Sequence, residues 1–319
     1  MSIQFENALI DAFKKLKPAD IRVNVEDRHL FVCGGTTDAT AKIPPSFRDR
    51  FLSFSADRYS DIHNSVVLAE SFKDYFKENA YPDLLVFEEE IANLSSLVII
   101  FLESPGSLVE LGMFCSRRDL YKKLLIIAPQ DDIQAEDSFI YLGPLESIKK
   151  SEPTSVAIYP WPTSTILSYD EEHLVDICEV IKQKLGSASR TRKFDPRNSG
   201  HIALLIAEII RIGYPLIVNE IELSLASMDL DIHLSHISRH LYLLNKIGLV
   251  NSHFYSGYRY YYPLNIPNAL ILPGSSRSLD ITKVRMSISQ SYILANDHQS
   301  RKRRSAMKGI NSLIDGSAK

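Results

Sequence analysis

The residues that could perform chemistry gather where one apolar stretch of the chain ends. Residues 96–113 begin as an uninterrupted run of large apolar side chains, break at a Ser-Pro-Gly-Ser turn and continue with helical spacing. Glu103 stands at the carboxyl end of the apolar run, and Glu110 follows in the expected helix. Two carboxylates at such a point are the groups needed to stabilise a positively charged, oxocarbenium-like sugar carbon.

The polar turn between this strand and helix comprises Ser104, Gly106 and Ser107 around a proline. A buried parallel strand, a tight turn and a helix N-terminus together form the usual ligand position in an open α/β sheet. We expect Ser107 to cap the helix and Glu110 to lie in its first turn, so that free N–H groups face an anionic ligand. The helix dipole alone also favours a glutamate near the N-terminus, so a purely structural role for Glu110 stays open.

Two other segments could reach the same ligand. An expected strand at 30–33 runs into Gly34 and Gly35, where the lack of a side chain lets the backbone approach a ligand closely, although a plain turn explains the pair equally well. Three consecutive acids, at positions 88–90, precede the apolar run. Such a run is usually a solvated helix face, but one of its members, with Glu89 as the candidate, could reach the pocket.

Strands and helices alternate through the first half of the chain. Strands are expected within 61–67 and at 30–33, 96–102, 122–128 and 155–159, and helices at 5–16, 44–54, 72–76, 84–92, 108–118 and 169–185. Pro45 is expected at the first position of the helix at 44–54. The alternation is typical of an α/β fold with a doubly wound parallel sheet.

The second half changes character after a basic segment with linker composition. We therefore expect a first domain at 1–186, a linker at 187–200 and a second domain at 201–319. In the second domain, expected helices at 201–212, 218–228 and 234–247 precede a hairpin at 251–262. This order is that of a winged helix-turn-helix domain, whose third helix enters the DNA major groove while the hairpin contacts the backbone.

Polar and basic side chains on these elements are candidates for nucleic-acid contact. A basic tail beyond the hairpin adds to them, since basic tails attract phosphates. The alternatives are a domain that docks protein, tyrosines that only pack the hairpin, and a tail that is a solvated helix end. The candidates are Ser235, His236, Arg239, Tyr258, Arg259, Arg301, Lys302, Arg303 and Arg304.

Composition narrows the classes of function. The 319 residues have a formal net charge of -3, so nucleic-acid binding must come from a local patch. The three cysteines lack CxxC spacing, which indicates neither a disulfide framework nor a zinc site, and no metal is expected. Residues 1–17 are amphipathic and charged, so we expect them not to be a signal peptide, and no apolar run is long enough to span a bilayer. We expect a cytoplasmic protein without membrane contact.

Residues 103–114, Glu-Ser-Pro-Gly-Ser-Leu-Val-Glu-Leu-Gly-Met-Phe, resemble the active-site segment of nucleoside 2-deoxyribosyltransferases. In those enzymes a polar turn precedes Glu-x-Gly at a helix start, and the glutamate is the sugar nucleophile. The chain more closely resembles effector proteins of bacterial retron anti-phage systems, which join a deoxyribosyltransferase-like N-glycosidase domain to a winged-helix domain. The motif resemblance covers 31–35 and 95–114, and it departs from the transferases at Glu103-Ser104, where they commonly have an aspartate.

The resemblance implies an N-glycosidase that cleaves the ribose–base bond of NAD or a nucleotide. Glu110 would be the nucleophile or oxocarbenium stabiliser, and Glu103 the second catalytic carboxylate. Because the nicotinamide of NAD is already cationic, it leaves without a general acid, so one carboxylate suits NAD at least as well as a neutral nucleoside. Transfer and hydrolysis both stay open. The implied substrate contacts are Gly34, Gly35, Ser104, Gly106, Ser107 and Glu89.

The resemblance also implies partners. No cofactor is expected, because NAD or the nucleotide would be the substrate. A retron reverse transcriptase with its multicopy single-stranded DNA would control the toxic activity, and assembly into an oligomer is left open. Two alternatives come from other classes of protein. They are a nucleotide-sensing winged-helix transcriptional regulator without turnover, and a scaffold.

Overall fold

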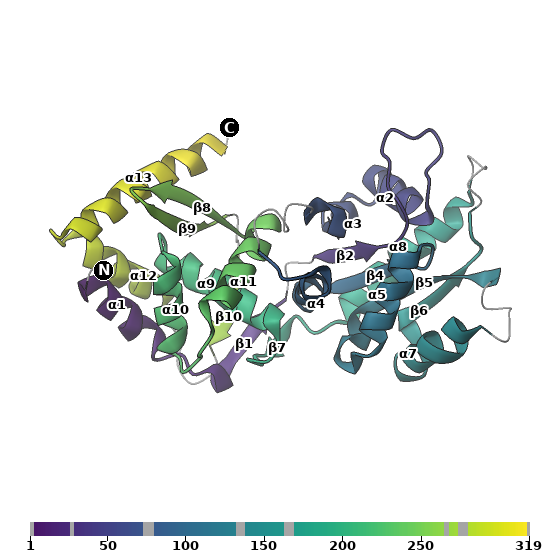
Figure 1. Cartoon of the computed structure of the whole chain (residues 1–319), viewed down its shortest axis with the longest axis horizontal. Helices are drawn as coiled ribbons and strands as arrows, with labels where there is room; N and C mark the ends of the chain where they lie inside the picture. The colour runs from purple at the N-terminus through teal and green to yellow at the C-terminus, as the bar shows by residue number, and fades with distance from the viewer. Residues whose placement is uncertain are drawn as a thin grey trace. The chain divides into compact units, whose positions relative to one another are not determined.

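The computed structural model describes residues 3–25, 29–72, 80–131, 138–162, 169–264, 268–273 and 280–317. The chain divides into two compact units whose elements are labelled in Figure 1. The helical unit comprises Met1–Glu26, Asp74–Phe87 and Arg190–Lys319, and the sheet unit comprises Asp27–Lys73 and Glu88–Ser189. Both units are therefore discontinuous in sequence, which differs from the expected division into 1–186 and 201–319.

The sheet unit contains the expected parallel sheet. Its five strands lie in the order β3-β2-β4-β5-β6, and every neighbouring pair is parallel. The central β4 is buried along its whole length, because side chains cover both faces of a parallel sheet. The bounds are β2 Leu30–Cys33, β3 Val66–Leu68, β4 Leu97–Phe101, β5 Leu124–Pro129 and β6 Val156–Tyr159.

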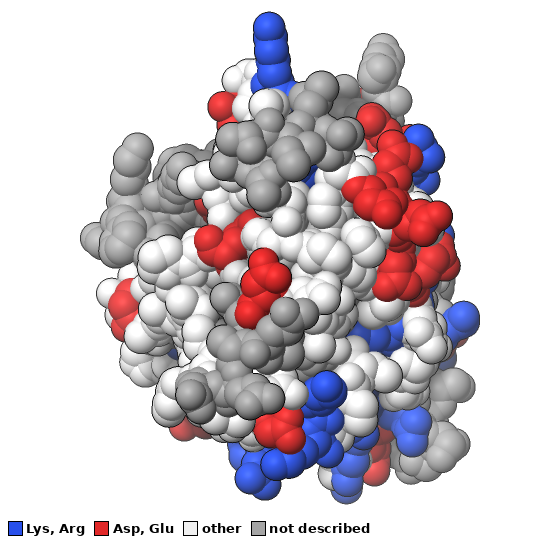
Figure 2. Space-filling view, turned by 90° about the vertical axis from the view of Figure 1, so that its right-hand side faces the viewer, with Lys and Arg blue, Asp and Glu red and all other residues white. Residues whose placement is uncertain are grey.

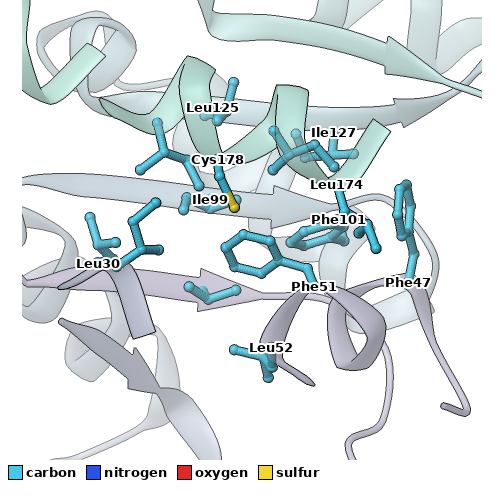
Figure 3. Packing of buried hydrophobic residues seen from close by; sticks show 14 of the residues in the cluster. Leu30, Phe47, Phe51, Leu52, Ile99, Phe101, Leu125, Ile127, Leu174 and Cys178 are labelled. Atoms are coloured by element: carbon cyan, nitrogen blue, oxygen red, sulfur yellow. The ribbon is translucent and has the colours of Figure 1, made fainter. Parts of the chain in front are cut away.

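One face of this sheet is packed by α2 and α8. Figure 3 shows Phe47 and Phe51 of α2, with Leu174 and Cys178 of α8, directed toward Phe101 and its neighbours on the strands. The helical segments of the unit are α2 Phe47–Arg58, α3 Ser60–His63, η2 Ala69–Phe72, α4 Leu84–Leu94, α5 Pro105–Cys115, η3 Arg118–Lys123, η4 Tyr141–Leu145, α7 Glu146–Ser151, η5 Pro153–Ser155 and α8 Glu171–Ser187. The first residues of α4 belong to the helical unit.

The start of α2 corrects one expectation. Pro45 was predicted at the first helical position, but α2 begins at Phe47. Ser46 is its N-cap, because its Oγ accepts a hydrogen bond from the Asp49 backbone N–H at 3.0 Å. The prolines therefore lie before the helix. The expected helix at 72–76 falls almost wholly outside the described residues.

The helical unit contains the expected three helices and hairpin. They are α9 Ser199–Gly213, α10 Val218–Ala226 and α11 Leu234–Lys246, followed by β8 Val250–Tyr255 and β9 Tyr258–Pro263, which pair antiparallel. The remaining elements were expected only in part. They are α1 Ile3–Phe13, η1 Pro18–Asp20, β1 Ile21–Asn24, β7 Thr191–Lys193, β10 Ile271–Pro273, α12 Ile281–Ile293 and α13 His298–Ser317.

Pairing of distant segments explains why the N-terminal residues join this unit. Strand β1 lies between β10 and β7 in an antiparallel sheet, and α1 packs on α10 and α12. The segment expected to be a linker therefore includes a strand. Residues 191–193 form β7 and pair with Arg22, Val23 and Asn24.

The surface is mixed in charge, in keeping with the formal net charge of -3. On the face shown in Figure 2, acidic side chains gather along the right-hand edge and several basic ones along the lower edge, while smaller acidic groups lie among the uncharged side chains of the centre. Within the part of the chain that the structure describes, no helix is long and apolar enough to span a bilayer. Cys33 and Cys178 are buried, as expected of core residues, and Cys115 is half-buried.

Candidate active site and nucleic-acid interface

The turn after β4 is closed by a reciprocal pair of serine hydrogen bonds. The Ser104 Oγ accepts from the Ser107 N–H at 3.1 Å, and the Ser107 Oγ accepts from the Ser104 N–H at 3.0 Å. The prediction that Ser107 caps α5 is therefore wrong, because Ser104 is the cap and Pro105 is the first helical residue. Ser107 is fully buried, so it is not exposed to a ligand. Glu110 consequently lies in the second turn of α5, not the first.

Glu103 is held by backbone donors from two elements. Its Oε1 accepts from the N–H groups of Gly35 at 2.9 Å and Arg48 at 3.0 Å, and its Oε2 accepts from the N–H of Phe47 at 2.7 Å. The carboxylate thus joins the turn after β2 to the first residues of α2, where the helix dipole favours a negative charge. A general acid must donate a proton, whereas both oxygens of Glu103 act as acceptors. These contacts favour a positioning role.

Replacing Glu103 by Gln is expected to lower the free energy of unfolding by about 1–3 kcal/mol. The amide keeps one acceptor oxygen and places an NH2 group against backbone donors that then have no acceptor. Urea unfolding measures the change, with Glu89→Gln as the control, because Glu89 is exposed. An unchanged stability combined with selective loss of nucleoside cleavage would instead assign Glu103 to catalysis.

A cavity of about 410 Å³ lies at the carboxyl edge of the sheet. It includes three of the expected site residues, Gly35, Glu103 and Ser104, but neither Glu110 nor the other substrate contacts proposed from the sequence. Only glycine fits at position 35, because a Cβ there would lie 2.7 Å from the Cβ of Ser46. The full lining is Gly35, Thr36, Pro44, Pro45, Ser46, Phe47, Arg50, Glu103, Ser104, Pro105, Trp161 and Pro162.

The sequence did not indicate two side chains of this cavity that suit a nucleotide. Arg50 supplies a cation, and Trp161 supplies a flat ring fixed edge-on against Phe47, with 4.9 Å between ring centroids. An arginine beside an indole and hydroxyl groups suits a phosphate attached to a planar base. Trp161 is the chain's one tryptophan and follows shortly after β6. This position, at the carboxyl end of a strand, could have indicated from the sequence that it lines the cavity.

Glu110 is half-buried and lies beside the buried Cys33 of β2 and Arg48 of α2, outside the lining of this cavity. Its Oε2 is buried and has no hydrogen-bond partner among the residues that the structure describes. Burial raises the pKa of the Glu110 carboxyl, while a hydrogen bond with the Cys33 thiol and the charge of Arg48 lower it in part. The buried Arg48 forms an ion pair with Glu70 and donates to the Val32 carbonyl at 3.3 Å.

Glu88 is a buried carboxyl near Glu110 that the sequence did not indicate. It is 5% exposed, and burial together with the charge of Glu110 raises its pKa to about 7. Glu89, the predicted candidate, is instead exposed and forms an ion pair with Arg117. The sequence could have indicated that Glu88 is buried. Phe87 and Ile91 mark the buried face of α4, and position 88 lies beside them on a helix.

This pKa of Glu88 predicts a pH dependence of stability. Between the ordinary value of 4.5 and about 7 the folded chain binds more protons than the unfolded chain. The contribution of Glu88 to stability is therefore fully present below pH 4.5 and is lost as the pH rises through about 7. Relative to wild type, Glu88→Gln should become more stable on going from mildly acidic to mildly alkaline pH. Urea unfolding at both ends measures this, and a pH-independent difference would contradict it.

Some of the residues predicted to contact nucleic acid, on α11 and the hairpin, line one common hollow. The spacing of Ile237, Leu241, Leu244 and Ile247 predicts the buried face of α11. The first three are buried, whereas Ile247 is the C-cap residue and is only half-buried. Ser235, Arg239 and Arg259 line a hollow of about 760 Å³, whereas His236 and Tyr258 do not. The full lining is Ala80, Tyr81, Pro82, Ser235, Ser238, Arg239, Leu241, Tyr242, Asn245, Ser252, Arg259 and Tyr261.

The basic tail is part of α13, and two of its arginines serve the fold. Arg303 is 4% exposed and forms an ion pair with the buried Glu220 of α10, which favours a structural role over the predicted nucleic-acid contact. Arg304 donates to the carbonyl groups at the end of α12, at 2.6 Å from Tyr292 O and 2.7 Å from Ala295 O. Arg301 is exposed.

Lys302, the remaining basic residue of this cluster, lies beside the hairpin. Its ammonium is 5.1 Å from the centre of the Tyr258 ring, and its Nζ is 3.4 Å from the carbonyl oxygen of Ser256. Of the four predicted tail contacts, Arg301 is therefore the one that reaches solvent most freely.

The family profile and the two similar proteins described below all belong to retron systems. The profile of the STM3845 retron effector protein matches residues 44–252, which include most of the sheet unit and α9 to α11. The "Retron Ec73 putative ribosyltransferase/DNA-binding protein" of Escherichia coli is 26% identical over 274 residues, covering 80% of this chain and 85% of the relative. The Escherichia coli protein of retron Ec86 with the same designation is 32% identical over 128 residues, covering 40% of this chain and 39% of the relative. The chain belongs to the STM3845 family of retron effector proteins.

Proposed function

We propose that the sheet unit of this retron effector cleaves the bond between the ribose and the base of NAD or a nucleotide. The observation that carries the proposal is the Glu110 Oε2, which is buried and unpartnered within the described part of the chain. An unpaired buried carboxylate oxygen costs stability, and such groups concentrate at functional sites. The positively charged carbon of a departing sugar would supply the missing partner.

The carboxyl of Glu88, near Glu110, could act as a general acid in the same reaction. Glu88, with a pKa of about 7, still holds a proton near neutral pH in a fraction of the molecules. Glycosidic cleavage uses a pair of carboxyl groups, one as general acid and one as nucleophile or charge stabiliser. In this proposal Glu110 acts on the sugar, and Glu88 protonates a neutral leaving base. Glu103 and the Gly34–Gly35 turn position the backbone at this edge of the sheet through the hydrogen bonds of the Glu103 carboxylate.

The helical unit, in this proposal, is a winged helix-turn-helix domain that binds nucleic acid. Its support is the order of three helices and a hairpin, together with the hollow that contains Arg239 and Arg259. The designation of the Ec73 relative combines the same two parts, ribosyltransferase and DNA binding. We infer that a retron reverse transcriptase and its single-stranded DNA hold the chain inactive through this unit.

Expression of the chain with and without the reverse transcriptase and its DNA tests both parts. Alone, the chain should arrest growth while NAD or a nucleotide pool falls. With its partners, growth and the pools should be normal. A nucleotide sensor without turnover would bind these compounds saturably and leave the pools unchanged, which would overturn the enzymatic proposal.

A further inference from the structure

The hollow beside α11 is walled on two sides. Its floor is the polar face of α11, formed by residues spaced three or four apart, Ser235, Ser238, Arg239, Tyr242 and Asn245. Ser252, Arg259 and Tyr261 of the hairpin contribute to one side, and residues 80–82 contribute to another. We call this hollow the α11 trough.

Tyr81 fixes one wall of the trough against the helix. The Tyr81 side chain is 4% exposed, and its ring centroid lies 6.0 Å from that of Tyr242. The Arg239 guanidinium lies 6.0 Å from the centre of the Tyr81 ring, and the Tyr81 hydroxyl donates a hydrogen bond to the Arg239 carbonyl at 3.4 Å. Part of the polar face of α11 is therefore already covered by this chain's own residues.

The chemistry of the trough suits an anionic ligand with flat rings. Arg239 and Arg259 are its charged lining residues, and no carboxylate lines it within the described ranges. This contrasts with a chain whose formal net charge is -3. Three tyrosines, Tyr81, Tyr242 and Tyr261, provide aromatic surface beside the cations. Rings and cations in one groove are the features with which proteins hold unpaired nucleic-acid strands.

We propose that the α11 trough binds an unpaired nucleic-acid strand, and that α11 does not enter the major groove of a duplex. The inference rests on the proposed nucleic-acid binding of the helical unit and specifies its ligand. A helix reads a major groove, about 12 Å wide, when its polar face projects from the domain. Here that face is the floor of a hollow of about 760 Å³, a volume within the range of pockets that enclose small ligands. Bases of a single strand can enter it and stack on Tyr261, while their phosphates pair with Arg259.

Fluorescence anisotropy with the full-length chain tests this proposal. The probes are a labelled DNA oligonucleotide without self-complementarity and the same oligonucleotide annealed to its complement, each titrated over a salt series. The wild-type chain should bind the unpaired strand about tenfold or more tightly than the duplex. Tyr261→Leu should weaken binding to the unpaired strand by about tenfold, and Arg259→Ala should reduce the slope of log K against log salt by roughly 0.7.

Matched controls come from the same unit. Tyr255→Leu alters a hairpin tyrosine that does not line the trough, and Arg197→Ala alters an exposed arginine elsewhere. Both should leave affinity and salt slope unchanged. Because Ser238 is exposed, Ser238→Glu should fold normally while it places a carboxylate in the trough, and it should weaken binding by about tenfold.

The outcomes separate the two proposals. Preference for the unpaired strand together with sensitivity to Tyr261→Leu and Ser238→Glu supports the trough. Tighter binding of the duplex, with both variants unaffected, overturns the trough but leaves nucleic-acid binding in place. Binding of neither probe overturns the proposed nucleic-acid function itself.

Discussion

Glu110→Gln is expected to abolish base release, by a factor of at least about 100, while the fold stays intact. The substitution keeps the shape of the side chain and removes the charge that would stabilise the sugar cation. Burial raises the pKa of Glu110, which means that its ionised form costs stability in the folded chain. The neutral amide removes this cost, so the variant should be as stable as wild type near pH 7, or more stable.

Chromatography of the free base and urea unfolding provide the two measurements. Glu89→Gln is the control, since Glu89 lies on the exposed side of α4 and pairs with Arg117. That variant should retain wild-type cleavage. A Glu110→Gln protein that still releases base would remove Glu110 from the chemistry, and one that unfolds would assign it a structural role.

Arg303→Ala should give the largest loss of stability among the basic residues of α13. Its guanidinium forms the buried ion pair with Glu220 and lies 3.6 Å from the centre of the Phe5 ring, so it joins α13 to α10 and α1. Removing one partner of a buried ion pair leaves the other charge uncompensated, at a cost of about 3–5 kcal/mol. The exposed Arg301, by contrast, should change the free energy of unfolding by about 0.5 kcal/mol or less on replacement by Ala.

Urea unfolding of the two variants tests this difference. The result also separates the structural role of the tail from a nucleic-acid role. Wild-type stability of Arg303→Ala, accompanied by weaker binding of an oligonucleotide, would contradict the buried ion pair and restore Arg303 as a phosphate contact.

Much of the architecture follows from local patterns. The strand at 30–33 was predicted to the residue, and β4, β5 and β6 within a few residues, because parallel strands buried on both faces are continuous apolar runs. The α11 helix and the hairpin were also predicted correctly. Ile237, Leu241 and Leu244 recur at helical spacing, and Ser256-Gly257 marks the turn.

The discontinuous units were not predictable in this way. β1, β7 and β10 are short strands, and the segments that pair are separated by more than a hundred residues in sequence. Thr191-Arg192-Lys193 has the composition of a linker, and only its pairing with β1 makes it a strand. The composition of a segment does not show which distant strand it pairs with, because β-strand formation depends on tertiary context.

The local structure around the candidate site was predicted in outline but not in detail. Ser104 and Ser107 are both able to cap a helix, and the proline between them was the feature that favoured Ser104. Glu88 and Glu89 are identical in chemistry, and only the buried face of α4 distinguishes them. The same holds for Arg301 and Arg303, whose burial depends on packing against α1 and α10.

Whether the sheet unit is an enzyme is decided by assaying the purified full-length chain, in the absence of a retron reverse transcriptase and DNA, for release of free base from NAD and from deoxynucleosides. The proposed enzymatic function predicts that wild-type protein releases nicotinamide or a nucleobase over many turnovers, and that Glu110→Gln releases none above background. Saturable binding of these compounds without release by wild-type protein, or equal release by Glu110→Gln, would contradict it.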